Sequence, residues 1–242
     1  MVKRTSVDVA VMVIQCSIST TLLMRYIEAK HATNCIVRIL LTKTSEEVTA
    51  AIAGFSSKYV DDWTLWLGIP FEERPAGLGK LLRKWQATRP HKMRRCRDEA
   101  DHAEPFLDDL VNDAAPVICD LKELNLTTFG RIGKEQLAGL ASLWTIFQQL
   151  PLRGKASCVG ITKAVMLLTD GSIGPALDSH VRKNAVIKKP QTAEAWIKVR
   201  HDVAEDIAAF ELSCGARLSS LAPEGFRHLE YGRLYDMALG PQ

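Results

Sequence analysis

The acid in GPALDSHVRKN, residues 174–184, occupies a position where one carboxylate could serve structure or chemistry. Asp178 follows a Gly-Pro turn and precedes a polar, basic helix start, which is the position of a helix N-cap that stabilises by about 1 kcal/mol. The same position favours the ionised acid, because a helix N-terminus presents free N–H groups and the positive end of its dipole. An ionised carboxylate can stabilise a developing cation or activate a water molecule. Both interpretations place Asp178 at the start of a helix.

Several expected elements lead up to this acid. An amphipathic helix within residues 134–150 ends at Leu150-Pro151, and residues 152–155 can form a short turn containing Gly154. An apolar helix over residues 157–168 and a Gly- and Pro-rich loop over residues 169–175 follow. The order is therefore helix, hairpin, helix, loop, acid, helix.

The remainder of the chain is also mostly helical in pattern. A second long amphipathic helix is expected within residues 193–214, and a final helix around residues 223–239. The best candidate for a strand is CIVRILL, residues 35–41, which could equally be a buried helical turn. The pattern predicts a mostly α fold.

The segment LDSHVR, residues 177–182, together with the preceding hairpin, resembles the helix-hairpin-helix (HhH-GPD) superfamily of base-excision DNA glycosylases. The family pattern is a Leu-Pro and Gly-rich hairpin, then a helix, then an acid in a sequence like Val-Asp-Thr-His-Val-x-Arg. In this chain Ser179 replaces Thr, Arg182 comes one place early, and Leu152 stands where Gly is usual, so the chain resembles a divergent member. The resemblance implies a multi-helix architecture with a central hairpin and a cleft between two helical lobes.

The resemblance also implies an activity. Such an enzyme flips a damaged or modified base out of DNA and hydrolyses its N-glycosidic bond, leaving an abasic site. Asp178 would stabilise the oxocarbenium-like sugar and orient or deprotonate the attacking water. In bifunctional members a lysine forms a Schiff base instead; Lys163 and Lys155 lie 15 and 23 residues before Asp178, shorter and longer than the usual interval. We therefore expect hydrolysis by Asp178 alone, with Lys163 as the candidate nucleophile for any AP-lyase activity.

The hairpin is expected to contact DNA. Backbone N–H groups of a Gly-containing turn at a helix start can bind a phosphate, often with a bound cation. No cofactor and no metal ligand set are expected, apart from a structural monovalent cation at the hairpin. The expected DNA-binding residues come from two alternative hairpin turns and from the helix start after the acid: Arg153, Gly154, Lys155, Gly160, Thr162, Ser179, His180, Arg182 and Lys183. If the hairpin is an ordinary helix connection, this set has no common role.

Positive charge is concentrated in two regions, although the net charge is only +3. Residues 79–98 contain eight Lys or Arg and one acid, and residues 153–200 contain nine basic residues and three acids. Eight acids then fall within residues 98–120. Such runs are usually solvated faces, and the basic run 79–98 and the acidic run 98–120 could touch across a loop. The alternative is a basic strip that binds DNA phosphates.

The sequence indicates a base pocket less clearly. Trp63, Trp66, Trp85 and Trp144 could stack on a flipped base or fill the gap it leaves. Trp144 lies on an apolar helical stripe, which predicts a core position, and packing is also the expectation for Trp63 and Trp66. Both a lesion and a modified base of foreign phage DNA fit as substrate, in repair or defence respectively.

Cysteine usage and the N-terminal segment bear on location. The six cysteines are scattered without a C-x-x-C pair, which argues against zinc or an iron–sulfur cluster and favours free, buried thiols in a reducing cytosol. Residues 7–30 are apolar but fall short of the ~18 continuous apolar residues of a spanning helix, and they show no cleavage site of a signal peptide. We expect a cytoplasmic, nucleoid-associated monomer that binds DNA and no membrane. The 242 residues suffice for one helical unit, with lobes 1–100 and 101–242.

Two other classes of protein stay open. A helical DNA-binding protein could keep the hairpin without the chemistry. The adjacent His201 and Asp202 suggest an HD-type metal phosphohydrolase, with His31 and Asp236 available as further ligands. Such an enzyme would contain bound metal and lose activity with a chelator.

Overall fold

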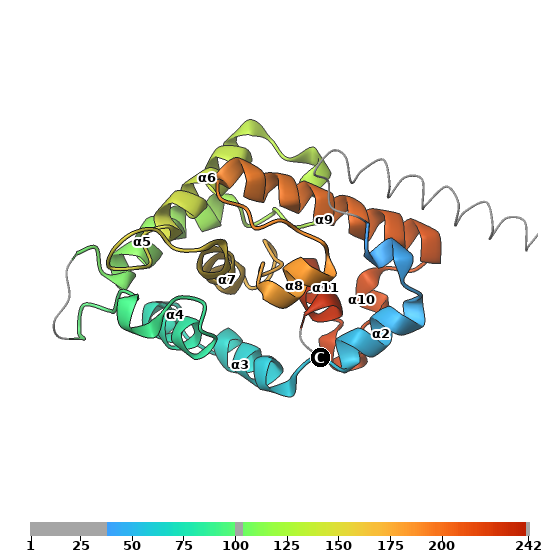
Figure 1. Ribbon diagram of the computed structural model, residues 1–242, viewed down its shortest axis with the longest axis horizontal. Helices are drawn as coiled ribbons and strands as arrows, with labels where there is room; N and C mark the ends of the chain where they lie inside the picture. Colours follow the sequence, from blue (N-terminus) through green and yellow to red (C-terminus); the bar gives the residue numbers. More distant parts are fainter. Residues whose placement is uncertain (1–37, 100–103, 241–242) are drawn as a thin grey trace, which may run out of the picture. The chain divides into compact units, whose positions relative to one another are not determined.

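The computed structural model describes residues 38–99 and 104–240, which form one compact unit (Figure 1). Its α-helices are α2 (Ser45–Ala53), α3 (Ser57–Leu67), α4 (Arg74–Lys84), α5 (Leu107–Asp120), α6 (Lys134–Phe147), α7 (Cys158–Leu168), α8 (Ser179–Asn184), α9 (Ala193–Cys214), α10 (Leu218–Leu221) and α11 (Tyr231–Leu239). Short 3-10 turns lie at Leu40–Thr42 (η1), Phe71–Glu73, Pro90–Lys92, Phe129–Arg131 and Glu224–Phe226. Over the described residues there is no strand beyond one isolated bridge, so the mostly α prediction is confirmed. The described part of the strand candidate runs into η1.

Helix α7 lies in the middle of this unit, with α4 and α6 packed against it (Figure 1). Every residue of α7 except Val159 is buried. A helix that is apolar on all sides is stable only in such a position, which explains the predicted apolar run. Thr162 and Lys163 are the exceptions in composition, and each needs a polar partner inside the protein.

The two predicted amphipathic helices pack against each other as α6 and α9. The Trp144 and Trp196 rings meet in this contact, with centroids 5.7 Å apart, and both are buried. Thr192 caps α9, its side chain accepting a hydrogen bond from Ala195 N at 3.2 Å. Gly215 ends the helix in the left-handed conformation, with φ 70°. Local signals therefore set both ends of α9.

Helices from the first hundred residues pack directly against helices from the rest of the chain. Helix α2 packs against α10 and α11, and α4 packs against α5 and α7, so these contacts cross the lobe boundary expected at residue 100. Turn η1 is attached to α9 because Leu40 N donates to the Asp206 carboxylate at 3.1 Å. The Tyr235 hydroxyl of α11 donates to the same carboxylate at 3.0 Å. A single buried acid thus links three elements.

The described thiols agree with the cysteine prediction in part. Cys96 and Cys158 are buried free thiols, Cys214 is half-buried, and Cys119 is exposed; Cys16 and Cys35 lie outside the described residues. Across the described ranges, no helix combines the length and apolar character needed to cross a membrane. The N-terminal segment 7–30 lies outside those ranges.

Candidate functional site

Asp178 is the N-cap of α8, where the sequence placed it. Its Oδ1 accepts hydrogen bonds from His180 N at 2.9 Å and Val181 N at 3.0 Å. Its Oδ2 lies 3.8 Å from Lys163 Nζ. One oxygen therefore caps the helix while the other faces a cation, and the structural and chemical interpretations are compatible.

Lys163 projects from the middle of α7 into the same site. Its side chain is only 8% exposed, and that of Asp178 is 19% exposed. Lys163 Nζ lies 5.3 Å from the ring centroid of Trp85 and 5.8 Å from that of Tyr59. Aromatic faces attract an ammonium group while excluding water from it. This is the partly desolvated setting that a lysine nucleophile requires.

Residue Leu177, just before the acid, is held on both sides. Thr162 Oγ1 accepts a hydrogen bond from Leu177 N at 2.9 Å, and Arg182 Nε donates to Leu177 O at 3.1 Å. The preceding loop lies directly on α11: a Cβ on Gly174 would sit 2.5 Å from a backbone atom of Gly232. The Thr162 side chain, next to Lys163, thereby positions the backbone next to Asp178.

A buried acid orients the aromatic wall. Asp62 accepts hydrogen bonds from Trp85 Nε1 at 2.8 Å and from Lys84 Nζ. Burial alone would raise the pKa of Asp62, but the hydrogen bonds from Lys84 and Trp85 bring it below its ordinary value. Of the four tryptophans considered from the sequence, Trp85 is therefore the one at the site.

These groups line one small cavity, which we call the Lys–Asp pocket. Its lining residues are Phe55, Tyr59, Trp85, Lys163, Met166, Ala176, Asp178, Arg233 and Asp236. The cavity volume is about 10 Å³, room for about one water molecule. A sugar or base would therefore have to lie at its mouth.

Helix α11 adds a second carboxylate to this pocket. Arg233 and Asp236 form a buried ion pair there, and Arg233 also stacks over the Phe55 and Trp63 rings. Burial raises the pKa of Asp236 to about 6, although the Arg233 charge acts in the opposite direction. Sequence reasoning considered Asp236 only as a metal ligand and missed Arg233; their i,i+3 spacing on one helix was the available signal.

The hairpin before α7 brings the two basic regions together. Leu152 N donates to Lys92 O at 2.7 Å, and Arg94 N donates to Leu150 O at 2.9 Å, so the hairpin lies beside the strip of residues 79–98. Gly154 adopts φ 77°, a left-handed turn that favours glycine. Arg153 and Lys155 on either side of it are exposed. The resulting surface is accessible and positively charged.

Two predicted DNA contacts lie inside the protein. Thr162 is fully buried and its hydroxyl is used by Leu177 N. Gly160 is buried within α7, where a Cβ would lie 2.8 Å from Thr88 Oγ1 and 3.2 Å from Ala87 O. Both residues serve packing, so their assignment to a phosphate-binding surface is corrected. Of the two turns considered, the one at Gly154 is the exposed one.

The remaining predicted contacts lie around the start of α8. Ser179, His180 and Lys183 are exposed, whereas Arg182 is half-buried and bound to the backbone. Part of the basic strip is neutralised by the acidic run, as the surface interpretation expected: Arg97 pairs with Asp109 at 2.8 Å, and Arg83 with Glu99 at 3.5 Å.

Gln86 is a further candidate that sequence reasoning missed. It is exposed, follows Trp85 directly, and has φ 50°, a conformation that is uncommon for residues other than glycine. Such backbone strain tends to occur at functional sites. No sequence pattern would have indicated it.

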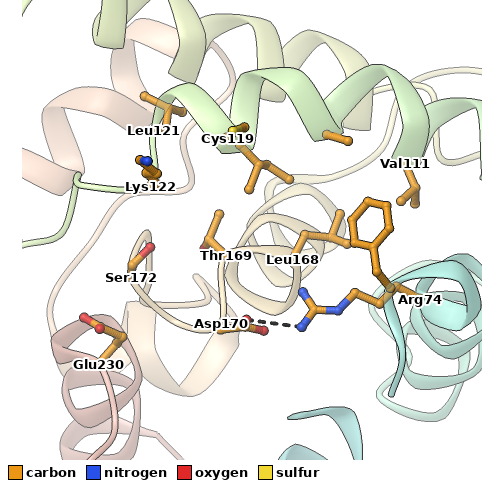
Figure 2. A pocket seen from close by; sticks show the side chains of 13 residues that line it. Arg74, Val111, Cys119, Leu121, Lys122, Leu168, Thr169, Asp170, Ser172 and Glu230 are labelled. Carbon is orange, nitrogen blue, oxygen red and sulfur yellow. Dashed lines mark hydrogen bonds and ion pairs between the residues drawn. The ribbon is translucent and has the colours of Figure 1, made fainter. Parts of the chain in front are cut away.

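A larger hollow of about 360 Å³ lies at the C-terminal end of α7, against α5 (Figure 2). Figure 2 shows Arg74 ion-paired with Asp170, 3.2 Å apart, while Lys122 and Glu230 line other parts of the wall. Its charges balance one another, and its apolar side chains come mainly from α5. The hollow is separate from the Lys–Asp pocket and shares no lining residue with it.

The residues considered for a metal phosphohydrolase do not converge. The His201 ring packs edge-on against the Phe129 ring, with centroids 4.9 Å apart. Asp202 Oδ2 forms an ion pair with Lys198 Nζ, 3.1 Å away. Asp236 belongs to the Lys–Asp pocket, and His31 lies outside the described residues. Within residues 38–99 and 104–240, no three His, Cys, Asp or Glu side chains are grouped to hold a metal ion.

Comparison of the chain with protein-family models, with curated proteins and with solved structures found no match. The resemblance to the helix-hairpin-helix glycosylases therefore rests on the sequence motif alone.

Proposed function

We propose that this protein is a DNA N-glycosylase of the helix-hairpin-helix kind, acting on a damaged or modified base. The observation that carries the proposal is the Lys163–Asp178 pair, with Nζ and Oδ2 3.8 Å apart in a small aromatic-lined pocket. An exposed basic hairpin immediately before α7 supports DNA as the partner.

The chemistry follows from these two groups. A base in a duplex must first rotate out so that its glycosidic bond becomes accessible. As that bond breaks, Asp178 Oδ2 stabilises the positive charge on the sugar. Lys163 Nζ, as the free amine, bonds to C1′ while the electron pair of the glycosidic bond leaves with the base. Its burial favours this covalent route over water attack, contrary to the expectation from the sequence interval.

The surroundings suit the DNA. Arg153 and Lys155 would hold the phosphate backbone without reading its sequence. Gln86, held outward next to Trp85, would fill the space left by the flipped nucleotide. Either a lesion or a modified base of foreign DNA remains a substrate under this proposal.

The test is release of free bases from a panel of damaged and modified DNA duplexes, detected by mass spectrometry. Asp178→Asn should lower release by at least about 100-fold, the usual scale for a group that stabilises transition-state charge. Asparagine is also a good N-cap, so α8 and DNA affinity should be preserved. Normal release by this variant would show that Asp178 has no catalytic role. DNA binding by the wild type with no base released from any duplex would favour the non-catalytic DNA-binding protein.

A further inference from the structure

The Lys–Asp pocket contains two carboxylates, and their environments differ. Asp178 Oδ1 accepts two backbone hydrogen bonds and Oδ2 faces Lys163. Asp236, only 5% exposed, pairs with Arg233 and lines the same cavity from α11. The fold therefore places a second buried acid, Asp236, in a pocket where the Asp178 carboxylate already faces Lys163.

The proposed reaction makes two incompatible demands on a single acid. Lys163 must lose a proton before its nitrogen can attack, and some group must accept that proton. If Asp178 accepted it, Asp178 would become neutral and could no longer stabilise the cationic sugar. The two tasks need two carboxylates.

On the basis of the proposed glycosylase function, we infer that Asp236 is the proton acceptor that converts the Lys163 ammonium group into the free amine. Both side chains line a cavity with room for about one water molecule, so the proton passes through one water.

The electrostatics of the pocket support this role. The charged and titratable side chains that face Asp236 are Arg233 on α11, Asp178 at the start of α8, Lys163 on α7, Arg200 on α9 and Tyr59 on α3. Burial raises the pKa of Asp236 to about 6; the charge of Asp178 also raises it, while those of Arg233 and Lys163 lower it. Asp236 is thus ionised at neutral pH and a stronger base than an ordinary aspartate.

The step balances without a further reactant. The proton moves from Lys163 Nζ to an Asp236 oxygen, and the freed lone pair forms the bond to C1′. The glycosidic electron pair leaves with the base, which takes a proton from solvent. Water then hydrolyses the Lys163–C1′ adduct, and Asp236 returns its proton to solvent before the next turnover.

The test uses borohydride trapping of the full-length protein on an abasic duplex, which does not depend on the identity of the base. The wild-type trapping rate should fall about tenfold per pH unit below about pH 6, as Asp236 becomes protonated. Asp236→Asn should trap at least about 100-fold more slowly at pH 7 and should lack this acid limb. Asp170→Asn is the matched control, because it also breaks an aspartate–arginine pair but lies outside the Lys–Asp pocket. It should behave as the wild type.

A second measurement keeps the inference testable if Asp236→Asn fails to fold. NMR titration of the aspartate carboxyl carbons should show Asp236 with a midpoint near 6, and a higher midpoint in Lys163→Met, where a neighbouring positive charge is lost. An unchanged midpoint in Lys163→Met, or an acid limb that persists in Asp236→Asn, would overturn the inference.

The two proposals fail differently. If bases are released but no Lys163-dependent adduct forms, the proposed glycosylase function is retained and the role of Asp236 as proton acceptor is rejected. If neither base release nor an adduct is detected, both the glycosylase function and the role of Asp236 are rejected.

Discussion

Replacing Thr162 by valine tests how the site is held together. Thr162 is fully buried, and its hydroxyl accepts the Leu177 N–H at 2.9 Å. Valine has nearly the same shape but no acceptor, so the variant leaves that buried N–H without its partner at a cost of about 1–3 kcal/mol. In a domain of this size each kcal/mol lowers Tm by about 2–4 °C, which gives an expected fall of about 2–12 °C.

The same change should affect chemistry, because Leu177 directly precedes Asp178. Loosening this anchor displaces the Asp178 carboxylate from Lys163, and a displacement of about 1 Å can cost as much as 100-fold in rate. We expect base release by Thr162→Val to fall at least about tenfold. Calorimetry and single-turnover base release measure the two effects.

Thr162→Ser is the control. It keeps the hydroxyl and loses one methyl group, so it should cost about 1 kcal/mol and leave base release close to that of the wild type. If the valine and serine variants are equally stable and equally active, the Thr162–Leu177 hydrogen bond does not position the acid.

Three further predictions concern packing, DNA contact and pH. Gly232→Ala should destabilise by about 3 kcal/mol or more, because its Cβ would lie 2.4 Å from backbone atoms, whereas Gly225→Ala, with nothing within 4 Å, should be neutral in urea unfolding. The double variant Arg153→Ala, Lys155→Ala should weaken DNA binding and lower the slope of log affinity against log salt by about 2; an unchanged slope would place the DNA elsewhere. Burial raises the pKa of Asp206 to about 6, so its stabilising effect is complete below about pH 4 and is lost as pH rises through 6, a change of up to about 3 kcal/mol. Asp206→Asn should remove that pH dependence from the free energy of unfolding, and an unchanged slope would contradict the assignment.

The elements that local signals determine were predicted closely. Helix α9 was expected within residues 193–214 from its apolar period, and it spans Ala193–Cys214. The Thr192 cap and the terminal Gly215 that set its ends also lie in adjacent sequence. The expected apolar helix over residues 157–168 is α7, Cys158–Leu168. Asp178 was recognised as an N-cap for the same reason, since a cap involves only the next three residues.

The composition of the site was only partly visible in the sequence. The number of residues between Lys163 and Asp178 argued against Lys163 as the nucleophile. The loop between them folds back over α11, however, and Lys163 Nζ lies 3.8 Å from Asp178 Oδ2. The hairpin turn at Gly160 was equally acceptable as a pattern until it proved to lie inside α7. Spacing along the chain does not give distance through a folded loop.

The sequence by itself determined that the chain is mostly helical, where α9 begins and ends, and that an acid starts α8. Only the tertiary structure decided that Lys163 is buried beside that acid, that Asp236 reaches the same pocket from the end of the chain, and that the hairpin lies next to the basic strip. The physical reason is the distance along the chain over which each kind of interaction acts. Helix propensity, apolar periodicity and capping act over a few residues, whereas desolvation and charge pairing depend on which distant segments pack together.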